Sequence, residues 1–225
     1  MIKNVRSQEG FTLIEIAIVL VIIGLILGGV LKGQELIENS KVKNAVKDIE
    51  GVGAAYYSYV DRYKRLPGDD GPLATLQGRG GDWVNITAAG NNDGIIAVTA
   101  AQTFTGAGEG GGFWQHLKAS GFVNGNPGDA GAVALPRNAF NGLTGFTNAL
   151  VMPAGAGGLT GNKVCMSQVP GKAAAAVDAQ LDDGLPNSGS LRATPGVSGA
   201  NTAPGGTVAG GVYNEGAVYT ICRNL

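Results

Sequence analysis

Two hydrophobic patterns follow each other at the start of the chain. Residues 11–31 are almost entirely apolar, whereas residues 32–66 carry apolar side chains at helical spacing with charges on the opposite face. Neither stretch contains proline, and Pro67-Gly68 then provides a stop signal. We therefore predict one helix over residues 11–66, apolar all round in its first half and amphipathic in its second half.

The pattern changes after Pro67. Short apolar runs alternate with Gly-, Asn- and Asp-containing turns, which is typical of short strands and helices in a compact domain. Strands are expected at 94–98, 149–152, 163–166 and 217–222, and helices at 113–119 and 173–181. Residues 186–216 are mostly Gly, Ser, Thr, Ala, Asn and Pro, so we expect a flexible, Gly-rich surface excursion near 186–216.

These patterns predict an α+β protein with four parts. Residues 1–10 form a leader, residues 11–31 a transmembrane or filament-core helix, and residues 32–66 the amphipathic half of the same stem. Residues 67–225 form a globular head in which a small antiparallel sheet packs on the stem.

The chain has 225 residues and a formal net charge of -1, with no dense run of Lys or Arg, so no clear nucleic-acid site is present in the sequence.

The apolar segment contains one unexpected residue, Glu15. As a helix, residues 11–31 would span about 32 Å, close to the hydrocarbon thickness of a bilayer. A signal peptide would have a shorter apolar stretch and a small-residue cleavage site after it. An ordinary anchor fits the length, but a carboxylate in a bilayer costs about 2.5–3.5 kcal/mol or more and indicates a function. A cut between Gly10 and Phe11 would supply a compensating amine four residues from Glu15.

The sequence GFTLIE, from Gly10 to Glu15, follows a short leader that contains Lys3 and Arg6. It resembles the processing site of type IV prepilins and of type II secretion pseudopilins. The resemblance implies that a prepilin peptidase cuts after Gly10 and that the new terminal Phe11 is N-methylated. It also implies that Glu15 helps to register each subunit in a helical filament. Three shorter blocks, YKRLPGDD, FWQHL and DDG, resemble a pattern of many glycine-rich pilin-like proteins.

The resemblance implies a structural subunit of a type IV pilus-like filament. Its partners would be further copies of itself, the prepilin peptidase, an inner-membrane assembly platform and, before assembly, the lipid bilayer. The chain would cross the bacterial inner membrane once with a periplasmic head, and would reside afterwards in an extracellular pilus or a periplasmic pseudopilus. A pseudopilin of a type II secretion system is the alternative, followed by a membrane-anchored periplasmic binding protein. The long glycine-rich head favours the pilus.

The two cysteines, Cys165 and Cys222, lie late in the chain. An even number of cysteines in an exported domain favours a disulfide, and two buried free thiols are the alternative. Pilins commonly close a C-terminal loop with a disulfide, and the resemblance therefore implies the same pairing here.

A calcium site is the only cofactor site that the sequence suggests. Asp69, Asp70, Asn91 and Asp93 offer oxygen ligands beside glycine turns, although the same pairs are common in turns without a metal. No catalytic motif is present, and the single histidine, His116, follows a tryptophan on an expected amphipathic helix. We therefore expect no enzymatic activity and no required cofactor.

Overall fold

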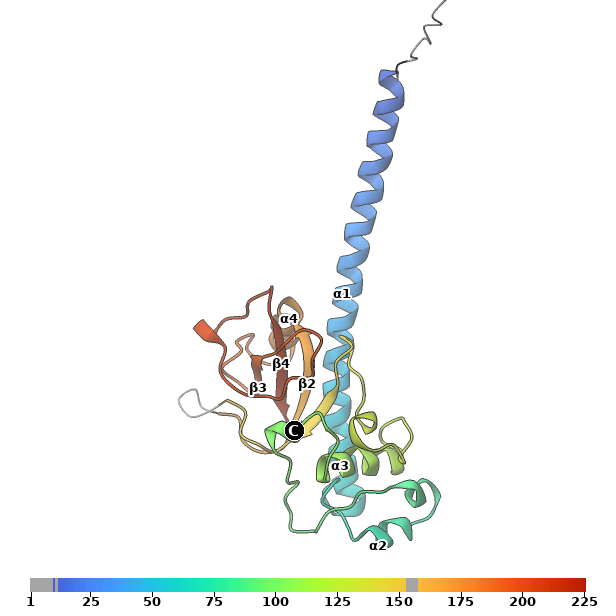
Figure 1. Ribbon diagram of the computed structural model, residues 1–225, viewed down its shortest axis with the longest axis vertical. Coiled ribbons are helices and arrows are strands. Elements are labelled where there is room, and N and C mark those ends of the chain that lie inside the picture. The colour runs from blue at the N-terminus through green and yellow to red at the C-terminus, as the bar shows by residue number, and fades with distance from the viewer. Residues whose placement is uncertain (1–9, 11, 153–157) are drawn as a thin grey trace, which may run out of the picture. The chain divides into compact units, whose positions relative to one another are not determined.

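The computed structural model describes residues 10, 12–152 and 158–225, and it has the expected α+β architecture (Figure 1). The chain divides into two compact units, Met1–Ser40 and Lys41–Leu225, and the first helix belongs to both. The described elements are α1 (Leu13–Tyr63), α2 (Leu73–Gln77), η1 (Gly81–Asn85), η2 (Ala100–Gln102), α3 (Glu109–Ala119), η3 (Gly131–Ala134), β1 (Thr144–Thr147), β2 (Lys163–Pro170), α4 (Gly171–Leu181), β3 (Leu191–Pro195), η4 (Ala209–Gly211) and β4 (Val218–Asn224).

The predicted long helix is confirmed as α1. It ends at Tyr63, three residues before the predicted end, because Lys64 adopts a left-handed conformation with φ 53°. A residue in this conformation after the last turn is a common way to end a helix. Proline 67 therefore follows the helix end at the distance expected for a residue that cannot continue it.

The part of α1 within the second unit, Lys41–Tyr63, supplies one side of the core. Val42, Ala45 and Ile49 join a cluster of buried residues that includes Met166 and Ile221 of the sheet. The last turns of α1 join a second cluster, whose buried aromatic members are Tyr56, Tyr59, Trp83, Phe104, Phe113, Trp114 and Phe146. The amphipathic pattern of the sequence thus corresponds to a face that packs on two adjoining cores.

The four strands form one antiparallel sheet in the order β1-β2-β4-β3. Cys165 on β2 lies opposite Cys222 on β4, and the two residues form a disulfide. The expected pairing is therefore present, and the alternative of two free thiols is wrong. The disulfide joins the two central strands of the sheet and closes a loop with a sequence separation of 57.

The segment 186–216 contains β3, which the sequence pattern did not predict. Strand β3 pairs with β4 along its whole length, and Leu191 and Ala193 are fully buried. Its outer edge is also occupied, because the Leu191 N–H donates to Asp182 and the Ala193 N–H donates to the Pro186 carbonyl. These bonds leave little of the edge open to another strand.

Side chains hold the rest of this segment to the head. The Asn187 amide donates to the Val208 carbonyl, and the Thr220 hydroxyl donates to the Thr202 carbonyl. Asn201 accepts hydrogen bonds from the Leu143 N–H and the Ser167 hydroxyl. The Tyr213 hydroxyl donates to Asp178 on α4. The structure thus connects this Gly-rich range to the sheet and to α4 through specific hydrogen bonds.

Two further strand predictions are wrong. Residues 94–98 form no strand, and their backbone groups bond to side chains: the Ala97 N–H donates to Glu109, and the Val98 N–H donates to Asn148. Within 149–152, Val151 forms one isolated bridge with Leu159, and Met152 has φ 69°. Several apolar residues at these positions are buried in the core, but their backbones do not pair with a neighbouring strand, so the apolar pattern alone misled the prediction. The predictions at 163–166, 217–222, 113–119 and 173–181 are confirmed as β2, β4, α3 and α4.

His116 is part of the core. Its side chain is fully buried on α3, its Nδ1 accepts a hydrogen bond from the Gly68 N–H at 3.0 Å, and its Nε2 donates to the Ala88 carbonyl at 3.1 Å. Burial lowers the pKa of His116 to about 4, because a charged ring would lose its hydration. The imidazole is therefore neutral and connects two loops.

Removal of the disulfide should destabilise the head. The chain-entropy relation for a loop of this size gives about 4 kcal/mol for a Cys165→Ala/Cys222→Ala double variant. Urea unfolding of the full chain in detergent micelles, followed by circular dichroism, measures the change. The reduced wild-type protein is the matched control and should unfold at the same midpoint as the double variant. Equal midpoints for the double variant and the oxidised wild type would contradict the prediction.

The buried neutral His116 should make stability fall in acid. The pKa of this group is lower in the folded than in the unfolded chain, so the unfolded chain binds the proton first as the pH falls from about 7 to about 4. A tenfold change in proton affinity corresponds to about 1.4 kcal/mol, and the full effect is on the order of 3 kcal/mol.

A His116→Asn variant isolates this effect. Burial raises the pKa of Asp178 to about 6, and this second group opposes His116 in the same pH range. We therefore compare the two proteins with each other at every pH. The Asn variant, which keeps an acceptor for Gly68, should be less stable at pH 7, and the difference should shrink toward pH 4. A difference that does not change with pH would show that His116 does not titrate in this way.

Candidate functional site

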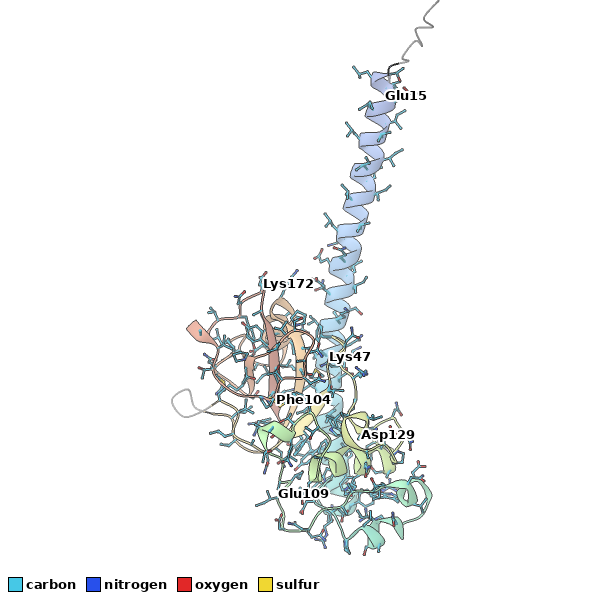
Figure 2. All side chains as sticks on the ribbon, in the orientation of Figure 1. Glu15, Lys47, Phe104, Glu109, Asp129 and Lys172 are labelled. Carbon is cyan, nitrogen blue, oxygen red and sulfur yellow. A yellow bond between two sulfur atoms is a disulfide. The ribbon has the colours of Figure 1, made fainter. Side chains whose placement is uncertain are left out.

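The start of α1 is a capping box. Thr12 precedes the first helical residue, and its hydroxyl accepts a hydrogen bond from the Glu15 N–H at 3.3 Å. Glu15 in turn accepts hydrogen bonds from the Thr12 N–H at 2.8 Å and from the Thr12 hydroxyl at 2.6 Å. This reciprocal pair satisfies backbone N–H groups that have no partner inside the helix. Figure 2 shows Glu15 in the first turn of α1.

The Thr-x-x-Glu spacing is the sequence signal for this box, although the hydrophobic pattern alone does not reveal it. Glu15 therefore has a local structural role that does not depend on a second subunit. However, a capping box neutralises no charge. Among the described residues, the ion pairs are all elsewhere, and none involves Glu15. Gly10 is exposed, and Phe11 lies outside the described residues.

The residues after Glu15 form an apolar surface that the described chain does not cover. Leu13–Tyr63 is the one described helix long and apolar enough to cross a membrane, and no part of its most apolar window is buried. Large side chains are exposed on all sides of it, among them Leu20, Leu25, Ile26 and Leu31. Such a surface is covered in practice by lipid or by other protein. This helix fits anchoring in the inner membrane.

Three of the four predicted calcium ligands come together. Asp69 accepts hydrogen bonds from the Asp93 and Gly94 N–H groups, at 3.2 and 2.9 Å. Asn91 contacts Asp93 twice, because its amide donates to the Asp93 carboxylate and its carbonyl accepts from the Asp93 N–H. These bonds are those of a tight turn, the interpretation that the sequence favours over a metal site. Calcium binding here stays a prediction.

The fourth predicted ligand, Asp70, has a different role. Its carboxylate accepts a hydrogen bond from the Tyr59 hydroxyl at 2.8 Å and forms an ion pair with Arg79 at 2.8 Å. The Arg79 guanidinium lies over the rings of Tyr63 and Trp83, at 4.5 Å from each centroid. The Asp70 carboxylate thus connects the end of α1 to the turn between α2 and η1, and its partners Tyr59 and Arg79 differ from those of the Asp69 carboxylate.

A second acidic group was not predicted as a set. Asp178, Asp182 and Asp183 place one carboxylate oxygen each within 4.8 Å of one another at the end of α4. Asp178 is buried, and the loss of hydration raises its pKa to about 6. Each carboxylate already accepts a hydrogen bond, from Tyr213, Leu191 and Ser188 respectively. Oxygen ligands at this spacing suit a hard cation such as calcium, but the same bonds fix the turn 182–191.

The residues considered for catalysis have structural roles. Both cysteines are in the disulfide, and His116 uses both ring nitrogens in hydrogen bonds within the core. A thiol nucleophile with a histidine base would require a free cysteine. The geometry of these three residues therefore serves folding.

Comparison with known proteins adds one result. Residues 5–31 match the family model of the prokaryotic N-terminal methylation motif. The curated proteins give no match to the chain. The matched residues include Gly10, Phe11 and Glu15, and they reach the end of the exposed apolar segment. Proteins with this motif in the pilin family are structural subunits, not enzymes. Residues 5–31 carry the signature of the prepilin-type signal, and this motif supports a protein of the type IV pilin or pseudopilin class.

Proposed function

We propose that the chain is a structural subunit of a type IV pilus-like filament. A prepilin peptidase would cut after Gly10, an inner-membrane platform would receive the subunit, and N-terminal helices of many copies would form the filament core. The observation that carries the proposal is Glu15, a charged group within an apolar helical segment that the described chain leaves exposed.

The energetics of Glu15 explain why assembly would follow. In the bilayer its hydrogen bonds to Thr12 satisfy polar groups, but the charge remains without a cation among the described residues. A bundle of processed subunits would bring the amine of Phe11 from a neighbour to this depth. The pair forms only when the two helices have the correct axial register, so it contributes specificity more than net stability.

The proposed cellular location follows from the same steps. Before assembly, the subunit resides in the inner membrane with its head in the periplasm, where the disulfide is stable. After assembly it is part of an extracellular pilus. A periplasmic pseudopilus would use the same signal and the same helix, and the site at which filaments accumulate distinguishes the two.

The first test is the mass of the N-terminal peptide. Protein purified from its native membrane should begin at Phe11 and be one methyl group heavier than the unmodified peptide. A Glu15→Gln protein is the control for cleavage and should be cut at the same bond. A chain that keeps Met1 in cells that contain the peptidase would contradict the proposal.

A pair of substitutions separates the charge of Glu15 from its capping role. Glutamine also completes a capping box, whereas alanine does not. If the charge registers the subunits, Glu15→Gln and Glu15→Ala should both insert in the membrane and both reduce filament yield, by about tenfold or more. Electron microscopy and quantification of sheared filaments measure the yield. Normal filaments from Glu15→Gln would mean that the glutamate serves as a helix cap and not as an assembly charge.

A further inference from the structure

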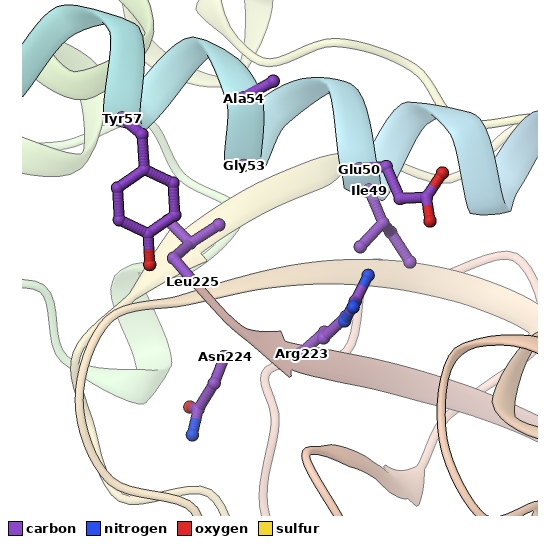
Figure 3. A pocket seen from close by; sticks show the side chains of 8 residues that line it. All are labelled: Ile49, Glu50, Gly53, Ala54, Tyr57, Arg223, Asn224 and Leu225. Atoms are coloured by element: carbon purple, nitrogen blue, oxygen red, sulfur yellow. The ribbon is translucent and has the colours of Figure 1, made fainter.

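Two grooves border the part of α1 that lies within the head. The first, the Arg223 groove, has a volume of about 480 Å³ and lies between α1 and the end of β4. Figure 3 shows Glu50, Gly53 and Tyr57 of α1 on one side of it and Arg223 and Leu225 on the other.

The second groove, the Asp48 groove, has a volume of about 320 Å³. Lys47, Asp48 and Gly51 of α1 line one side, and Phe122 and Arg137 line the other. Apolar side chains such as Val52 and Phe122 also line it, and both Lys47 and Arg137 are exposed. The groove therefore offers apolar contacts beside charged side chains.

The two grooves lie on opposite flanks of the buried face of α1. An α-helix turns by about 100° per residue, so Gly51 and Gly53 point about 200° apart. Val52 lies between them in direction and is buried in the core. Each glycine therefore marks one flank of the same helix, and each lines one groove.

Packing within the described chain does not require these glycines. A Cβ at Gly51 would meet no atom within 4 Å, and a Cβ at Gly53 would lie 3.7 Å from Leu225, an ordinary contact. A glycine in the middle of a helix nevertheless costs about 1 kcal/mol relative to alanine. Close approach of another chain to the helix backbone would explain a residue without a side chain at these positions.

Both grooves carry charges of both signs, so each offers partners for the other. The Asp48 groove carries Lys47, Asp48 and Arg137, and the Arg223 groove carries Glu50 and Arg223. None of these five side chains takes part in an ion pair among the described residues. Partial burial against the groove raises the pKa of Asp48, which no cation within ion-pair distance counteracts. A guanidinium from outside would supply that cation.

We propose that the two grooves are the two halves of one contact between neighbouring copies of this chain. In this contact Asp48 of one copy faces Arg223 of the next, and Lys47 of the first faces Glu50 of the second. The inference rests on the proposed filament function and names the partner that the head contacts.

The type of symmetry supports a second copy as the occupant. A contact that joins two different surfaces of the same chain is heterologous, and its repetition produces an open helical filament. Copies whose stems run parallel present opposite flanks of α1 to each other. Membrane or filament attachment through the N-terminal helix also raises the local concentration of heads, so a small contact suffices. The paired charges would set the register of the heads more than the affinity.

Chemical cross-linking tests the contact directly. The chain has two cysteines, both in the disulfide, so the introduced cysteines are the only free thiols. A chain with both Asp48→Cys and Arg223→Cys, assembled with wild-type subunits absent, should form a ladder of dimers, trimers and larger species with a short bis-maleimide. Filaments of either single variant, treated in the same way, should give only monomers on a denaturing gel. The matched control, Asp82→Cys with Arg223→Cys, uses an exposed acid outside both grooves and should give at least about tenfold less ladder.

Charge reversal gives an independent readout. Asp48→Arg and Arg223→Asp should each lower filament yield by about tenfold, and the double variant should recover most of it. Asp82→Arg should leave the yield unchanged. If wild-type filaments form but the ladder and the recovery are both absent, the groove contact is wrong and the filament function stands. If the processed wild-type chain forms no filaments, both proposals are overturned.

Discussion

The need to cover the apolar surface of α1 governs this protein. In the head, the residues Val42 to Tyr59 at helical spacing are covered by the sheet, by α3 and by the loops around Trp83. In the segment before Ser40, no part of the described chain covers the equally apolar surface from Leu13 to Leu31. At about 25 cal/mol per Å² of apolar surface, exposure of so many large side chains to water is not sustainable. The same helix therefore folds one part of the chain and requires an external environment for the other.

The head reaches a single structure with few large apolar residues and many glycines. Polar side chains replace a strand ladder where the chain runs irregularly, as Glu109 and Asn148 do for residues 97 and 98. His116 holds the Gly68 and Ala88 backbones together from inside the core, and Asn201 holds Leu143 and Ser167. Glycine permits the close approaches that such loops need: a Cβ on Gly111 of α3 would lie 2.3 Å from the Gly106 carbonyl oxygen. The glycine-rich loops of the head are thus held by specific hydrogen bonds, although their composition alone would suggest mobility.

The sequence predicted those features whose cause is local, and it failed where the cause is distant. The stem, α4 and strand β4 have helical periodicity or β-branched residues, and they were found close to their observed limits. Strand β2 was found at its start, but it continues four residues beyond the predicted end. Strand β3 was missed because the short run Leu191-Arg192-Ala193-Thr194 lies within a glycine-rich segment and has no clear alternation of apolar and polar residues. It forms a strand by pairing with β4. The start of α3 was missed because Glu109-Gly-Gly-Gly has poor helix propensity, which close packing overrides.

The candidate sites show the same division. The residues Gly10, Phe11 and Glu15 were recognisable because their chemistry depends on neighbours within five positions of the chain. The role of Asp70 could not be predicted in this way, because its carboxylate binds Tyr59 and Arg79, which only the fold brings close to it. The grooves beside Gly51 and Gly53 could not be predicted from the sequence either, because the residues that line their other sides lie far along the chain.

Charge has a consistent place in this architecture. Inside the head, ionised groups such as Asp70 and Arg79 are paired and hydrogen-bonded, so they define how α1 ends against its neighbours. Glu15 in the apolar segment and Asp48 beside its groove have no cation within the described chain. In the proposed filament, a correctly placed copy would supply the cation that each of these carboxylates lacks in the monomer. Apolar surface would supply the attraction between subunits, but it tolerates many registers. The two unpaired carboxylates would restrict that choice, Glu15 at the level of the helices and Asp48 at the level of the heads.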